Sequence, residues 1–65
     1  MFKVGSRYKH MSMLDVSIYV QRIVKENNKD TLLNVNYLDH NGMVIGDSEV
    51  ISIKVSDNWK WKELK

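Results

Sequence analysis

Asp39-His40-Asn41-Gly42 separates two runs of alternating apolar and polar residues, and this stretch decides the fold class of the chain. Before it, apolar residues occupy every second position of 33–37, and a second alternating run begins at Met43. An Asn-Gly pair adopts positive φ at little cost, which the tight turn of a twisted hairpin requires. The stretch therefore predicts a β-hairpin over residues 31–45.

The rest of the chain also favours strands. Val, Ile, Thr, Tyr, Trp and Phe make up 20 of the 65 residues, whereas Ala, the best helix former, is absent. Polar and glycine-containing turns separate five predicted strands, over residues 2–4, 16–24, 31–38, 43–55 and 59–64. Residues 6–14 are predicted as a long first loop, with a strand that continues through Tyr8 as the alternative. A slip in the apolar phase predicts a bulge near Gln21-Arg22, and residues 46–48 are expected to interrupt their strand as a bulge or bend.

A helix competes with the second of these strands. Ser12 followed by Asp15 resembles a capping box, and the apolar residues that follow also fit helical spacing. A helix over residues 13–26 would make the fold α+β. We favour the strand because five of the nine residues 16–24 are β-branched and would lose χ1 freedom in a helix.

Three short segments mark the order of the elements: Phe2-Lys3-Val4-Gly5 at the start, Asn41-Gly42 in the hairpin and Ser56-Asp57-Asn58 before Trp59. With a long first loop between the first two strands, this order of strands and turns resembles an SH3-like barrel of the Tudor or KOW type. The resemblance implies one all-β domain over residues 1–65, a five-stranded antiparallel barrel whose first loop borders the ligand groove. The chain lacks the Ala-Leu-Tyr-Asp-Tyr motif of domains that bind Pro-rich ligands, so no family ligand is carried over.

Composition argues against an enzyme. The chain has no Cys, and its only two imidazoles, His10 and His40, do not supply the ligands of a structural zinc site. Neither a phosphate-binding loop nor a nucleophile elbow is present. We therefore expect no catalytic, metal-binding or cofactor-binding residues. No apolar run approaches the about 20 residues of a membrane helix, and the N-terminus lacks a signal-peptide core. We expect no membrane contact and a cytoplasmic location.

Two basic segments form the candidate binding surface. The first loop contributes Arg7, Tyr8, Lys9 and His10, and the closing strand contributes Lys60 and Lys62. The first and last strands of SH3-like barrels lie close together, so the resemblance implies one continuous patch, with Tyr8 as its aromatic anchor. In a strand, Trp59 and Trp61 would share one face. Either both tryptophans pack on the core, or at least one forms a stacking platform beside the lysines.

These features predict a non-catalytic interaction module that binds another protein. The net charge of +2 is modest for a dedicated nucleic-acid binder. Direct nucleic-acid binding through Arg7, Lys9, Lys60, Lys62 and the aromatic residues is the alternative. Self-association is a third hypothesis, because a chain of 65 residues has a small core that gains from added buried area. The 8 Lys and 6 Asn residues are typical of AT-rich genomes, which suggests a small phage-type accessory or regulatory protein acting in the host cytoplasm.

Overall fold

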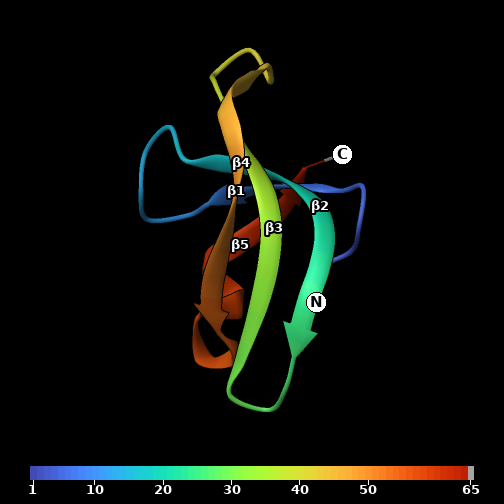
Figure 1. The fold of residues 1–65 in the computed structure, drawn as a ribbon. Coiled ribbons are helices and arrows are strands. Elements are labelled where there is room, and N and C mark those ends of the chain that lie inside the picture. The colour runs from blue at the N-terminus through green and yellow to red at the C-terminus, as the bar shows by residue number, and fades with distance from the viewer. Residues whose placement is uncertain (65) are drawn as a thin grey trace.

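The computed structural model describes residues 1–64 and shows five antiparallel strands in one sheet (Figure 1). The elements are β1 (Arg7–His10), β2 (Ser17–Glu26), β3 (Asp30–Leu38), β4 (Val44–Lys54), the 3-10 helix η1 (Val55–Lys60) and β5 (Trp61–Leu64). The strand order is β4-β3-β2-β1-β5. The predicted all-β class is confirmed, and residues 13–26 contain the strand rather than the competing helix. No ladder joins the edge strands β4 and β5 within residues 1–64, so closure into a barrel remains a prediction.

The three long strands form a meander that contains the predicted irregularities. Figure 1 shows β2, β3 and β4 as long curved ribbons, crossed by the shorter β1 and β5. The register of β2 against β3 shifts between Val20 and Arg22, which confirms the predicted bulge, and shifts again between Ile23 and Lys25. In β4 the predicted irregularity is a bulge rather than a break: the strand continues through Gly46, whose φ is +67°. The bulges increase the local twist and curl the sheet around its core.

The core lies on the inner face of the curled sheet. Tyr8, Ile18, Val20, Leu33, Val35 and Ile53 pack there with Phe2, and Ile23, Tyr37, Ile51 and Trp61 cover the margin. Val20, Leu33 and Val35 have no exposed surface. Period-two alternation predicts that Val20, Val35, Ile51 and Ile53 share one core. Val20, Val35 and Ile53 are buried there, and Ile51 is partly buried against them.

The prediction of a first strand over residues 2–4 was wrong. Strand β1 occupies residues 7–10, inside the predicted loop, because it pairs with β2 on one side and with β5 on the other. The preceding segment instead ends in a turn at Gly5, whose φ is +86° and whose N–H donates to the carbonyl of Val20 at 2.8 Å. Phe2 is nevertheless buried, edge-on against Tyr8 with 4.9 Å between ring centroids.

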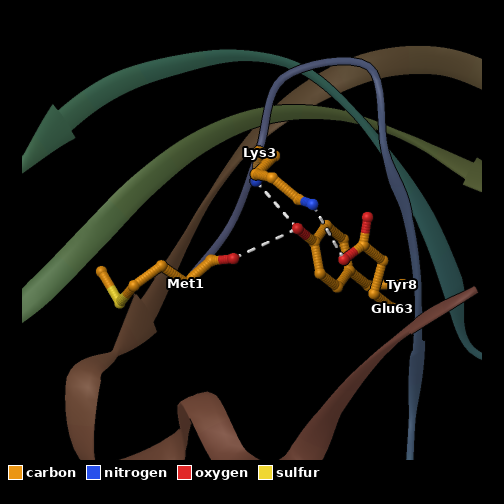
Figure 2. A network of polar contacts seen from close by, with 4 residues as sticks. All are labelled: Met1, Lys3, Tyr8 and Glu63. Atoms are coloured by element: carbon orange, nitrogen blue, oxygen red, sulfur yellow. Dashed lines mark hydrogen bonds and ion pairs between the residues drawn. The ribbon is translucent and has the colours of Figure 1, made fainter.

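The hydroxyl of Tyr8 fastens the N-terminal segment to the sheet (Figure 2). It accepts the backbone N–H of Lys3 at 2.8 Å and donates to the carbonyl of Met1 at 3.3 Å. The ammonium of Lys3 also forms an ion pair with Glu63 of β5 at 3.3 Å. Tyr8 is therefore a structural residue at the centre of the N-terminal packing.

The prediction that the last strand begins at Trp59 was also wrong. Residues 55–60 form η1, and β5 begins at Trp61. Trp59 is 72% exposed, whereas Trp61 is half-buried and packs against the core. The two tryptophans do not share a strand face, because Trp59 lies in the tighter winding of the 3-10 helix.

Candidate functional site

The β1–β5 ladder gathers three cations on the outer face of the sheet. Lys9 lies directly opposite Lys62, and Arg7 lies opposite Leu64. Residues that face each other across antiparallel strands point to the same side, as do alternate residues of one strand. Arg7, Lys9 and Lys62 therefore share one surface, which we call the basic face. The predicted proximity of residues 7–10 to the closing strand is confirmed.

The cations of the basic face have no carboxylate partner within the described part of the chain. The two ion pairs found in residues 1–64 join Lys3 to Glu63 and Lys60 to Asp57, each at 3.3 Å. Like charges directly opposite each other across a ladder are destabilising. Lys9 and Lys62 thus concentrate positive charge at a cost to the stability of a small domain.

Two of the candidate residues do not reach this face. Tyr8 is 4% exposed and His10 is 8% exposed, and both side chains point to the inner side of β1. Their burial follows from alternation once residues 7–10 form a strand. The expectation that Tyr8 offers an aromatic anchor at the surface is therefore wrong.

Lys60 belongs to a separate cluster on η1. Its ammonium pairs with Asp57 and lies 5.7 Å from the ring centroid of Trp59, within the range of a cation–π contact. Its backbone carbonyl accepts the N–H of Met11 at 2.6 Å, so this cluster adjoins the loop that follows β1. Lys60 is thus near the basic face in the fold while its charge is already partly neutralised.

Two hollows border the basic face and share Lys9 and Leu64. One, of about 400 Å³, lies between β1 and the turn 39–42. The other, of about 390 Å³, is lined by Lys9, His10, Met11, Leu14, Lys62 and Leu64. We call this second hollow the Met11–Leu14 groove. Met11 is 58% exposed and Leu14 is 86% exposed, so the groove offers apolar contact between two lysines.

Sequence reasoning missed the apolar side of this site. Met11, Met13 and Leu14 stand in a segment that was interpreted only as a basic loop. The sequence did contain a signal for this surface, because apolar residues in a loop that lack strand or helix periodicity indicate exposed binding surface. Leu64, 38% exposed, was assigned to the closing strand without a role.

His10 holds one wall of the groove in place. Its Nδ1 accepts the backbone N–H groups of Ser12 at 3.1 Å and of Met13 at 3.0 Å. Its ring packs edge-on against Trp61, with 4.7 Å between centroids. The loop 11–15 ends at Asp15, whose φ of +62° is a conformation that Asp tolerates better than most residues.

The turn 39–42 forms the far rim of the first hollow. Gly42 has a φ of +82°, as predicted, whereas Asn41 does not adopt positive φ. The N–H of Gly42 donates to the carbonyl of Asp39 at 2.9 Å. The carboxylate Oδ1 of Asp39 accepts the N–H groups of Met43 at 2.9 Å and Asn41 at 2.8 Å. These bonds, that of Met43 first, lower the pKa of Asp39.

Acid should therefore loosen this turn, and Asp39→Asn should reduce the effect. Because the folded-state pKa lies below the unfolded value, the carboxylate contributes stability above about pH 4, and this contribution is lost as the pH falls through the folded-state pKa. Asn keeps an acceptor oxygen without a titrating proton. Thermal unfolding from pH 7 to pH 2 should show a shallower acid slope for the variant. Equal slopes for the two proteins would contradict the prediction.

No cluster of three or more His, Cys, Asp or Glu side chains that would hold a metal ion occurs in residues 1–64. Burial, and then the charge and hydrogen bond of Glu49, raise the pKa of Tyr37, which favours the protonated phenol.

The part of the chain described contains no helix with the length and apolarity needed to cross a membrane.

Comparison with protein-family models, with curated proteins and with solved structures finds no significant match to this chain. The function is therefore inferred from the chemistry of its own residues.

Proposed function

We propose that the chain is a non-catalytic binding module that holds an acidic segment of another protein against the basic face. The observation that carries this proposal is the direct opposition of Lys9 and Lys62 across the β1–β5 ladder. Without a ligand, this pair costs stability. A carboxylate placed between the two ammonium groups converts the repulsion into two charge-assisted contacts.

The Met11–Leu14 groove defines the partner further. Its two lysines flank the exposed side chains of Met11, Leu14 and Leu64. A segment in which acidic residues flank an apolar side chain matches this pattern in both charge and polarity. Methionine suits such a surface because its flexible thioether adapts to different partners.

The order of the elements supports the proposed SH3-like fold. Strand β1 pairs with both β2 and β5, and a 3-10 helix leads directly into β5. These features agree with a barrel whose first and last strands are neighbours. The Lys-rich and Asn-rich composition supports the accompanying proposal of a small phage-type accessory or regulatory protein.

The double variant Lys9→Glu/Lys62→Glu should weaken binding of an acidic and apolar ligand by at least about tenfold, which corresponds to about 1.4 kcal/mol. A suitable probe is a fluorescent synthetic peptide of alternating Glu and Leu, with binding followed by anisotropy at low salt. Lys25→Glu/Lys54→Glu is the matched control, since it makes the same change of net charge at exposed positions of β2 and β4.

Capture from a nuclease-treated bacterial lysate extends this test to natural partners. A genuine partner binds the parent and the Lys25/Lys54 control but not the Lys9/Lys62 variant. Equal peptide binding by both double variants would refute the role of the basic face.

Nucleic-acid binding is the second candidate, and the exposed indole of Trp59 beside Lys60 supports it. Aromatic rings stack on bases, with about 1–3 kcal/mol lost per base on truncation to Ala. If this candidate holds, a single-stranded oligonucleotide binds the parent with a steep salt dependence, and Trp59→Ala weakens it. The peptide and oligonucleotide arms thus separate the two classes of partner.

A further inference from the structure

We propose that His10 acts as a pH-dependent latch, by which we mean that its imidazole holds the loop 11–15 in place only while it is neutral. Protonation of the imidazole releases this loop and disrupts the Met11–Leu14 groove. The release of the loop follows from the geometry of His10 alone. Its consequence, that acid weakens partner binding, rests on the proposed function of the groove.

The latch consists of one acceptor nitrogen and two backbone donors. Nδ1 of His10 accepts from Ser12 at 3.1 Å and from Met13 at 3.0 Å. Because both partners are N–H groups, Nδ1 must carry a lone pair, so the neutral imidazole has its proton on Nε2. A proton added at Nδ1 removes the acceptor and places a donor against two donors.

At two other loops of this chain a side-chain acceptor also binds two backbone N–H groups. Oδ1 of Asn27 accepts the N–H groups of Lys29 and Asp30, each at 2.8 Å, and Oδ1 of Asp39 accepts from Asn41 and Met43. An amide oxygen does not titrate, and the pKa of Asp39 is lowered. An imidazole is the side chain that normally gains its proton between about pH 5 and 8. Of these three loops, the one at the groove is held by an imidazole nitrogen, an acceptor that protonation removes.

The groove that His10 lines already contains two lysines. The charged groups on its own strand are Arg7 and Lys9. The elements packed against it contribute Asp15 from the loop, Asp57 and Lys60 from η1, and Lys62 and Glu63 from β5. The two ion pairs found in residues 1–64 join Lys3 to Glu63 and Lys60 to Asp57, and Lys9 and Lys62 line the same groove as His10. The ring itself is 8% exposed and lies against Trp61.

Loss of the latch acts directly on the groove wall. Met11 and Leu14 stand on the loop that the two bonds hold, and Leu14 is 86% exposed. Beyond these bonds, the N–H of Met11 still donates to the carbonyl of Lys60. We therefore expect the loop to open from residue 12 onward while β1 and the sheet stay folded.

Backbone amide NMR between pH 8 and pH 5 tests the latch without any partner. In the parent, the protection factors of Ser12 and Met13 should fall by about tenfold, which corresponds to about 1.4 kcal/mol. The change should follow the titration of the His10 ring. His10→Asn should retain protection at both pH values, since Asn27 shows that an amide oxygen accepts from the second and third residues beyond it. His40→Asn, which removes the exposed second imidazole, should behave as the parent.

Binding of the Glu–Leu peptide then tests the consequence. The parent and His40→Asn should lose about tenfold in affinity from pH 8 to pH 5, whereas His10→Asn should not. Unchanged protection of Ser12 and Met13 in the parent while His10 titrates would overturn the latch, even if His10→Asn failed to fold. Tighter peptide binding by the parent at pH 5 would also overturn it. If the Lys9/Lys62 and Lys25/Lys54 double variants bound the peptide equally at pH 8, the proposed function would be refuted. The amide-exchange measurement on Ser12 and Met13 would still test the latch.

Discussion

Leu33→Ala is expected to lower the free energy of unfolding by about 2–5 kcal/mol, the usual cost of truncating a fully buried Leu. Leu33 has no exposed surface and lies in β3, which pairs with β2 on one side and β4 on the other, within the cluster that includes Ile18, Val20 and Val35. A domain of this size has few other apolar contacts to offset the cavity. Urea unfolding monitored by tryptophan fluorescence would measure the change, and the variant should be largely unfolded at 37 °C.

Leu14→Ala provides the matched control, because it makes the same chemical change at a side chain that is 86% exposed. Its free energy of unfolding should change by less than about 0.5 kcal/mol. The same variant should weaken binding at the Met11–Leu14 groove, so one pair of substitutions separates residues that hold the fold from residues that face a partner. Comparable destabilisation by Leu33→Ala and Leu14→Ala would mean that Leu33 is not part of the hydrophobic core.

Gly42→Val should destabilise the protein by about 1–3 kcal/mol, the cost of forcing a β-branched residue into the left-handed region. The φ of Gly42 is +82°, and a Cβ built there lies 3.3 Å from Nη1 of Arg7. The strain is intrinsic to the backbone, whereas the contact can relax by movement of the flexible Arg7 side chain. Thermal and urea unfolding would measure the loss.

The neighbouring residue supplies the control for this effect. Asn41 does not have positive φ, and its side chain is exposed. Asn41→Val should therefore cost less than about 0.5 kcal/mol. Similar losses at the two positions would show that the turn requires positive φ at both, as a two-residue hairpin turn would.

Local signals predicted much of this fold. The alternation at 33–37 and the turn at Gly42 predicted the hairpin, and the β-branched residues of 16–24 correctly favoured a strand over a helix. These signals act between residues a few positions apart, where side-chain alternation and backbone sterics are sufficient. The bulge at Gln21 was predictable for the same reason, because a slip in apolar phase must be absorbed within the strand.

Non-local pairing explains the errors. Residues 7–10 show weak periodicity by themselves, and they form a strand because β2 and β5 pair with them from both sides. Once they do, alternation buries Tyr8 and His10 and exposes Arg7 and Lys9. The predicted proximity of residues 7–10 to the closing strand is therefore confirmed, and Arg7, Lys9 and Lys62 share one face, whereas the prediction of Tyr8 as an exposed aromatic anchor is wrong.

The amino-acid sequence by itself determined the all-β class, the central hairpin and most of the core, because each follows from the conformational preferences of adjacent residues. The tertiary structure decided which residues form β1, the register that sets Lys9 opposite Lys62, and the exposure of Trp59 on η1. The β1–β5 register joins segments from opposite ends of the chain. No local pattern encodes that register, since it depends on how the whole sheet curls around its core.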